Sequence, residues 1–115
     1  MKRLLLLVLL LAGCSAQAEV LDVTISASTK TLQAFEPVTI TASVDAGGPV
    51  SEGAEIDFEL IAPSGQTMGS VNPTNNGDGT YSIETSFDAA GTYRIIAHVD
   101  YDNAHEMPEV EVTVQ

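Results

Sequence analysis

Two histidines and a methionine near the carboxyl terminus are the residues of this sequence best suited to chemistry. His98, His105 and Met107 lie close together along the chain. Imidazole nitrogen and thioether sulfur in one ligand set prefer copper, especially Cu(I), because both are matched to a soft ion. Met68 would supply a fourth ligand if its segment lies nearby. These four residues therefore raise the hypothesis of a copper site.

The same residues also have a purely structural interpretation. His98 would be a surface residue of a strand, and His105 would cap or decorate a loop. Met107 would pack at the edge of the fold, since methionine fills irregular apolar gaps. Under this interpretation the protein holds no metal and no other cofactor. The sequence leaves both interpretations open.

Other polar motifs favour structure over catalysis. The stretch Asn75–Gly79 contains Asn, Gly and Asp, but it lacks the ligand spacing and the distant glutamate of a calcium loop, so we interpret it as a turn. Glu55, Asp57 and Glu59 alternate along one strand and could bind a cation, but we interpret them as a solvated face. No serine lies on a glycine-flanked turn from a strand into a helix. We therefore expect no catalytic residues and a protein that is not an enzyme.

The only cysteine follows a short apolar run at the amino terminus. Lys2 and Arg3 precede residues 4–12, which are all apolar. A helix of that length rises about 14 Å, too little to cross roughly 30 Å of hydrocarbon, so the run is typical of a signal peptide. The closing residues Leu11-Ala12-Gly13-Cys14 resemble the bacterial lipobox. That resemblance implies cleavage before Cys14 and acylation of its sulfur.

This interpretation divides the chain into three parts. Residues 1–13 would be a lipoprotein signal peptide in a helix, residues 14–19 the lipidated cysteine with a short tether, and residues 20–115 a single domain. Two or more acyl chains would hold the protein stably in a lipid bilayer. We therefore expect an exported protein, anchored to the outer face of a bacterial cell membrane or to an outer membrane.

The charge of the chain limits its partners. The net charge is −12, with sixteen acidic and four basic residues. Two of the basic residues, Lys2 and Arg3, would leave with the signal peptide, so that Lys30 and Arg94 alone would remain. Nucleic acids and anionic lipid surfaces both require basic patches, and we therefore expect no nucleic-acid partner.

Apolar residues alternate with polar ones along most of the domain. This period of two predicts strands with one buried and one wet face, as in antiparallel sheets. Glycine, proline and asparagine clusters separate the runs and predict turns. We expect six clear strands and a weak one around 68–71, forming a seven-stranded antiparallel immunoglobulin-like β-sandwich. Tyr93 would pack in the core and tie a corner of the sandwich through its hydroxyl. The predicted strands lie within residues 21–27, 38–44, 56–60, 68–71, 81–87, 93–99 and 110–114.

Several motifs resemble known bacterial domains. Gly48-Pro49-Val50, Gly77-Asp78-Gly79-Thr80-Tyr81 and Ala90-Gly91-Thr92-Tyr93 are similar to motifs of bacterial immunoglobulin-like domains. The closing stretch from His98 to Pro108 resembles the end of the YtkA-like domain. That family includes small bacterial lipoproteins and is related to FixH-like proteins. The resemblance extends over nearly the whole chain after the signal and implies a β-sandwich.

Two functions follow as hypotheses. The first is a non-catalytic interaction or accessory module of the cell envelope that contacts other envelope proteins, with exposed sheet edges as its docking surface. The second is a copper-binding, chaperone-like lipoprotein that uses the His/Met cluster. The relation to FixH-like proteins, which are tied to oxidase assembly, supports the second hypothesis.

Overall fold

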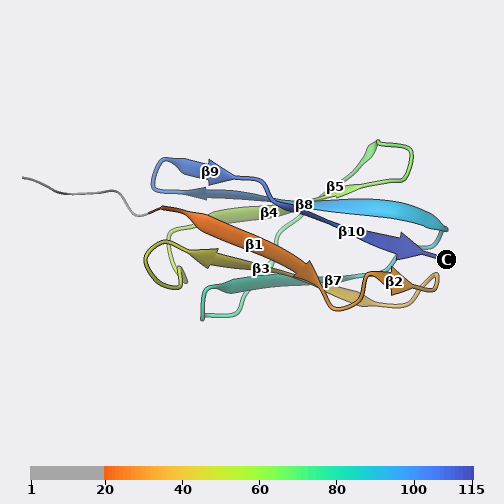
Figure 1. The fold of residues 1–115 in the computed structure, drawn as a ribbon, viewed down its shortest axis with the longest axis horizontal. Helices are drawn as coiled ribbons and strands as arrows, with labels where there is room; N and C mark the ends of the chain where they lie inside the picture. The colour runs from red at the N-terminus through yellow and green to blue at the C-terminus, as the bar shows by residue number, and fades with distance from the viewer. Residues whose placement is uncertain (1–19) are drawn as a thin grey trace, which may run out of the picture.

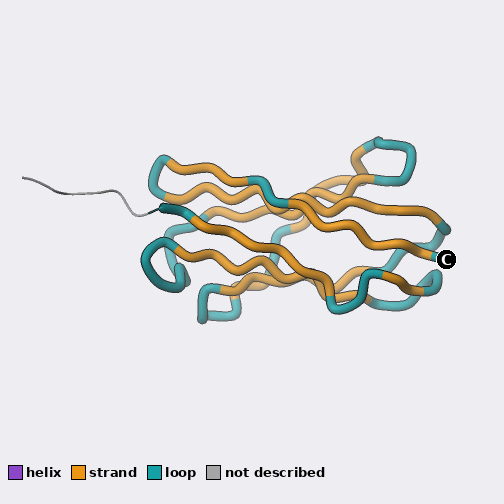
Figure 2. The backbone as a smooth tube through the Cα atoms, in the orientation of Figure 1, coloured by secondary structure: helices purple, strands orange, loops and turns teal. Residues whose placement is uncertain are grey.

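The structure is a computed structural model that describes residues 20–115. These residues form strands joined by loops and turns, and none of them lies in a helix (Figure 2). Residues 20–115 therefore contain no helix long and apolar enough to cross a membrane. The predicted signal helix, Cys14 and the tether lie outside the described residues.

The first of two sheets has four strands in the order β1-β3-β7-β6 (Figure 1). All of its neighbouring strands are antiparallel. Strands β1 and β6 are its edges. The bounds are β1 Asp22–Ala27, β3 Val38–Asp45, β6 Thr74–Asn75 and β7 Thr80–Thr85.

The second sheet has six strands, with the path β2-β10-β8-β4-β5 and with β9 paired to β8. Strand β8 is central, because it pairs with β4 on one side and with β9 and β10 on the other. The bounds are β2 Thr31–Leu32, β4 Glu55–Ile61, β5 Thr67–Val71, β8 Gly91–Tyr101, β9 Ala104–Glu106 and β10 Glu109–Val114.

The prediction of an all-β sandwich is confirmed, but the predicted number of seven strands is wrong. Residues 20–115 form ten strands. Strands β2, β6 and β9 have two or three residues each, which is too short for an alternating pattern to be visible. The sheets are also not purely antiparallel, because β2 pairs with β10 in parallel.

Strands β9 and β10 continue each other along β8. Glu106 lies opposite Val99 in the first ladder, and Glu109 lies opposite Ile96 in the second. The register is therefore unbroken between the ladders. Pro108 interrupts the hydrogen bonding because it has no N–H to donate, although its carbonyl accepts a 2.9 Å bond from the N–H of Ala97.

The core lies between the two sheets. The alternating apolar residues predicted for most strands are buried, as in Val38, Ile40, Ala42 and Val44 of β3. Strand β1 differs, because its apolar residues are only partly buried at the edge of a sheet. The largest side chains with under 2% exposure are Phe58, Ile40, Ile95, Val38, Val44, Val99 and Val112.

Two predicted local structures are confirmed. The hydroxyl of Tyr93 donates a 2.8 Å hydrogen bond to the carbonyl of Ala89, and the ring is buried against Phe87, so Tyr93 is a core residue that ties a corner. In the turn from Asn75 to Gly79, Asp78 Oδ1 accepts hydrogen bonds from the N–H and the hydroxyl of Thr80. These bonds lower the pKa of Asp78 below its ordinary value.

Candidate functional site on the outer face of strand β8

Alternation along β8 separates a buried face from an outward one. Tyr93, Ile95, Ala97 and Val99 are buried, so His98 points outward as predicted. The His98 side chain keeps 32% of its surface exposed. It is therefore accessible to solvent while its backbone is held in the middle of a sheet.

A carboxylate of the neighbouring strand holds His98. Glu59 of β4 accepts a hydrogen bond from the imidazole, with 2.9 Å between Oε1 and Nε2. Asp57 is the direct partner of His98 in the ladder, so the bond to Glu59 runs diagonally across the pair of strands. The hydrogen bond from His98 is the main cause that lowers the pKa of Glu59.

The second imidazole is held in the same manner. His105 of β9 lies opposite Asp100 of β8, and its Nδ1 is 2.7 Å from Asp100 Oδ1. The ring centroids of His98 and His105 are 6.2 Å apart, with an angle of 37° between the planes. The structure therefore brings both predicted imidazoles together on one outward face.

Met107 also belongs to this group by register. It lies between Glu106, opposite Val99, and Glu109, opposite Ile96, so its partner across the strands is His98. Directly opposite residues of two strands point to the same face of a sheet. The Met107 side chain is 55% exposed. We define His98, His105 and Met107 as the His/Met face.

Met68 lies apart from the His/Met face. It belongs to β5, between Thr67 and Gly69, which pair with the end of β4 at Ile61 and Leu60. Strand β4 separates β5 from β8, and Leu60 is opposite Ile95 rather than His98. Two strand spacings and three residues of rise place Met68 on the order of 14 Å from His98. The fold therefore does not bring Met68 to the other three residues.

The ligand types present restrict the metal ions that could bind. Residues 20–115 contain no group of three or more His, Cys, Asp or Glu side chains that could hold a metal ion. For a metal bound by His98 and His105, the Met107 sulfur is the further ligand that the register places on the same face. Thioether sulfur selects soft ions such as Cu(I) over Mg²⁺ or Ca²⁺, which prefer oxygen.

Sequence reasoning missed Glu59 as a partner of a histidine. We expected a solvated row of carboxylates at Glu55, Asp57 and Glu59. That row does face outward, but two of its members are bound: Glu59 to His98, and Asp57 to the side-chain amide of Asn72 at 2.8 Å. Alternation along the sequence indicates that Glu59 and His98 both face outward. It does not indicate that β4 lies beside β8, and the contact between the two side chains depends on that.

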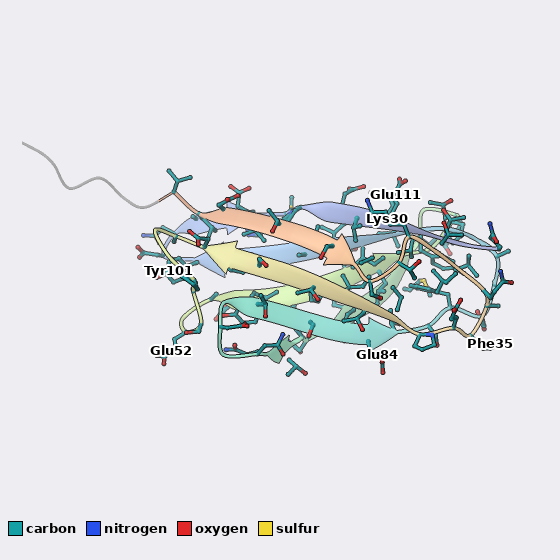
Figure 3. All side chains as sticks on the ribbon, turned by 60° about the horizontal axis from the view of Figure 1, so that its bottom comes forward. Lys30, Phe35, Glu52, Glu84, Tyr101 and Glu111 are labelled. Carbon is teal, nitrogen blue, oxygen red and sulfur yellow. The ribbon has the colours of Figure 1, made fainter. Side chains whose placement is uncertain are left out.

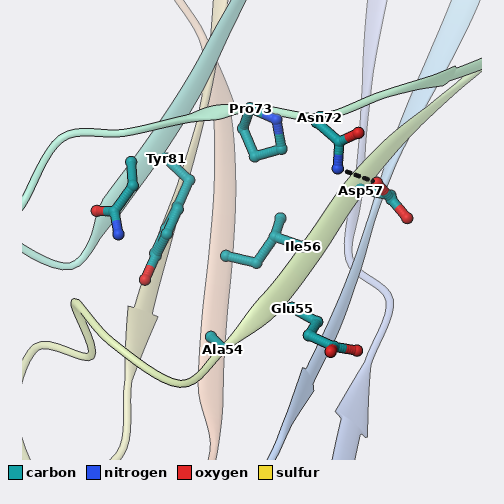
Figure 4. A pocket seen from close by; sticks show the side chains of 8 residues that line it. Ala54, Glu55, Ile56, Asp57, Asn72, Pro73 and Tyr81 are labelled. Atoms are coloured by element: carbon teal, nitrogen blue, oxygen red, sulfur yellow. Dashed lines mark hydrogen bonds between the residues drawn. The ribbon is translucent and has the colours of Figure 1, made fainter.

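A separate cleft of about 440 Å³ opens beside β4 (Figure 4). It is lined by Glu55, Asp57, Asn72 and Tyr81 among others. The hydroxyl of Tyr81 donates to the carbonyl of Val50 at 2.7 Å, and Asn72 donates to Asp57. Three of the four polar side chains named here are thus already hydrogen-bonded within the protein, which favours a structural role for the cleft over a binding site.

The His/Met face lies toward one end of the domain. The hairpin between β8 and β9 is at the same end as the start of β1 (Figure 1). Tyr101, at the end of β8, lies at this end of the molecule. Phe35, which is 73% exposed, lies at the other end (Figure 3). The site therefore lies toward the same end of the domain as the start of β1, although the two belong to different sheets.

Residues 15–98 of the chain match the YtkA-like family. The matched region covers more than half of the chain and ends at His98, so His105 and Met107 lie beyond it. No curated protein matches the sequence.

Similar solved structures show the fold. An engineered protein has a TM-score of 0.65 at 18% identity, over 91% of this chain but only 21% of its own. The soluble domain of PmoD from Methylocystis has a TM-score of 0.54 at 14% identity, over 88% of this chain and 95% of its own. The PKD domain of human SorCS2 has a TM-score of 0.53 at 16% identity, over 90% of this chain and 80% of its own.

Proposed function

The chain belongs to the YtkA-like family, and from this membership we propose that it is a non-catalytic accessory module of a bacterial cell envelope. In this proposal Cys14 is acylated and anchors the exported domain in a lipid bilayer. The tether from Ser15 to Glu19 reaches under about 20 Å, which keeps the domain close to the membrane surface. The module works by contact with other envelope proteins.

The observation that carries this proposal is an uncharged strand at the edge of a sheet. Strand β5 ends the path of the larger sheet, and all five of its residues are exposed. No charged residue occurs between Glu59 and Asp78, although the chain as a whole is strongly acidic. Met68 and Val71 expose 53% and 40% of their surfaces there.

This edge suits an extended, uncharged segment of a partner protein. Unpaired backbone groups at a sheet edge accept an added strand, and the exposed apolar side chains add contact area. When an uncharged segment pairs with β5, neither strand has ionised side chains that must lose their hydration. Elsewhere the many carboxylates of the domain would repel an acidic partner.

Photo-crosslinking in cells tests the docking surface. A photoreactive amino acid replaces Met68 in the full chain, and the matched control carries it at Ser26 on β1, an edge of the other sheet. We expect an adduct with one envelope protein from position 68 alone, and its loss when Val71→Lys adds a charge. Equal adducts from both positions, or only an adduct of two copies of this chain, would contradict the proposal.

Metabolic labelling with palmitate tests the anchor. The wild-type chain is expected to take up label and to fractionate with membranes, whereas Cys14→Ser is expected to take up none. Labelling that persists in Cys14→Ser would place the acyl group elsewhere.

The His/Met face favours a second candidate function, the handling of copper. Its support is the 6.2 Å separation of the two imidazole rings together with the position of Met107 opposite His98. A site near the start of the domain would also lie near the membrane if Cys14 is the anchor. An exchange of copper with a membrane-bound partner would then need little movement.

A Cu(I) titration tests the second candidate. The full chain carries Cys14→Ser, since a free thiol would itself bind Cu(I), and competes anaerobically with a chromophoric chelator. We expect one equivalent to bind, with at least tenfold weaker binding when His98→Ala and His105→Ala are added. Equal and weak binding by both proteins would exclude a copper site on this face.

A further inference from the structure

We propose that Glu59 and Asp100 are positioning residues that fix the tautomers of His98 and His105, so that one defined nitrogen of each ring faces a Cu(I) ion. This inference rests on the copper-handling candidate function and deepens it by naming the ligand atoms. The ligands are His98 Nδ1, His105 Nε2 and the sulfur of Met107.

The tautomer of His98 follows from its bond to Glu59. An ionised carboxylate can only accept hydrogen bonds, so the ring nitrogen that contacts it must carry the proton. The contact is made by Nε2 at 2.9 Å. In the neutral ring the lone pair is therefore on Nδ1, the nitrogen that can bind a metal.

The tautomer of His105 is the opposite one. Here Nδ1 is 2.7 Å from Asp100 Oδ1, so Nδ1 carries the proton and Nε2 carries the lone pair. The two carboxylates come from different strands, β4 and β8. The tautomer of His105 is thus specified within its own hairpin, whereas that of His98 is specified by a strand distant in the sequence.

The ring separation agrees with one shared ion. A metal ion lies about 2.0–2.1 Å from an imidazole nitrogen, which places it about 3.2 Å from the ring centroid. Two imidazoles on one ion then have centroids at most about 6.4 Å apart. The observed 6.2 Å is within this limit.

Met107 supplies the third ligand from the strand position opposite His98. The cross-strand partner of Met107 is His98. The adjacent pair, Ala97 and Pro108, is a hydrogen-bonded pair. Because the two kinds of pair alternate along an antiparallel ladder, His98 and Met107 form a non-hydrogen-bonded pair. Side chains approach each other more closely at such pairs. The sulfur can therefore reach an ion held by His98.

Carboxylates that hold the second nitrogen of a ligating histidine have a known physical effect. They fix the orientation of the ring and raise the basicity of the ligand, and their loss typically weakens metal binding by 10–100-fold. Glu59 and Asp100 are in this position for both rings of the site.

Nuclear magnetic resonance of the metal-free protein tests the tautomers directly. Long-range ¹H–¹⁵N correlations from the histidine rings of the full chain with Cys14→Ser distinguish a protonated Nε2 from a protonated Nδ1. We expect the Nε2–H form for His98 and the Nδ1–H form for His105. With Asp100→Asn, His105 is expected to move toward a mixture of forms.

Cu(I) competition tests the consequence for binding. Glu59→Gln and Asp100→Asn are each expected to weaken Cu(I) binding by 10–100-fold. The matched control is Asp57→Asn, which removes the same charge from the same face but contacts Asn72 instead of an imidazole. It is expected to change the affinity by less than about threefold. Backbone amide spectra verify that each variant is folded.

The outcomes separate this inference from the function on which it rests. If the parent chain binds Cu(I) no better than the double histidine variant, the copper function fails and the inference with it. If the parent binds tightly but Glu59→Gln and Asp100→Asn bind as well as Asp57→Asn, the positioning role is overturned while the copper function stands. Tautomers opposite to those expected would also overturn the assignment of the ligand atoms.

Discussion

The two faces of strand β8 have different tasks although they alternate along one stretch of chain. On the inner face Tyr93, Ile95, Ala97 and Val99 are at most 3% exposed and join the two sheets. On the outer face His98 and Asp100 contact polar groups of neighbouring strands and remain open to solvent. The comparison indicates that the buried side chains of the inner face stabilise the fold and fix the backbone of β8. The side chains of the outer face can therefore bind a ligand without being needed for stability.

The largest expected effect is the loss of an inner side chain. Ile95→Ala leaves a cavity in the core and is expected to lower the free energy of unfolding by about 2–5 kcal/mol. Ile96→Ala, the next residue on the outer face, is expected to lower it by about 1 kcal/mol or less. Denaturant unfolding of both variants measures the difference. Equal losses would break the distinction between the faces.

A smaller effect is expected at the corner of the inner face. Tyr93→Phe keeps the buried ring but removes the hydrogen bond to the carbonyl of Ala89. We expect a loss of about 1 kcal/mol in the free energy of unfolding, because the carbonyl is left without its donor. Thermal unfolding measures it. No change in stability would show that the hydroxyl has no part in holding the corner.

A pH-dependent effect is expected at the turn before β7. The bonds from Thr80 lower the pKa of Asp78 in the folded protein below its ordinary value of 3.8, so the unfolded chain takes up the proton first as the pH falls. The stability that Asp78 contributes is complete above that ordinary value and is lost as the pH falls through the lowered pKa.

Asp78→Asn tests this dependence. The variant is expected to be less stable than the parent at neutral pH and to approach it in stability as the pH falls through the lowered pKa of Asp78. Unfolding by urea between pH 2 and 7 measures the gap. A gap that stays constant over this range would contradict the assigned cause.

The smallest effect on stability is expected on the outer face. His98→Asn and His105→Asn remove the partly exposed hydrogen bonds to Glu59 and Asp100, and contacts between partly exposed polar side chains contribute little to stability. We expect changes within about 0.5 kcal/mol in the free energy of unfolding, together with the loss of Cu(I) affinity proposed above. A large loss of stability would assign these residues to the scaffold and would favour the structural interpretation of the histidines.

The sequence was sufficient to predict the sandwich because its long strands alternate strictly. The apolar positions of β3 and β8 identify a buried face without knowledge of any partner strand. The short strands β2, β6 and β9 could not be predicted, since two or three residues show no period and form only where a neighbour offers backbone groups.

The site was predictable only in part, for a similar reason. The outward direction of His98 follows from alternation, and the approach of His105 follows from a hairpin return. The bond to Glu59 depends on which strand lies beside β8 and in which register, and that is decided by packing across the whole sandwich. The separation of Met68 from the site depends on the same order of strands.

X-ray absorption at the copper edge tests most directly the claim that the outer face of β8 is a soft-metal site. The full chain with Cys14→Ser is loaded with one equivalent of Cu(I) and compared with the same chain carrying Met107→Leu. We predict two imidazole ligands and one sulfur in the first protein, and loss of the sulfur in the second. A copper environment without sulfur, or one that Met107→Leu leaves unchanged, would contradict the account.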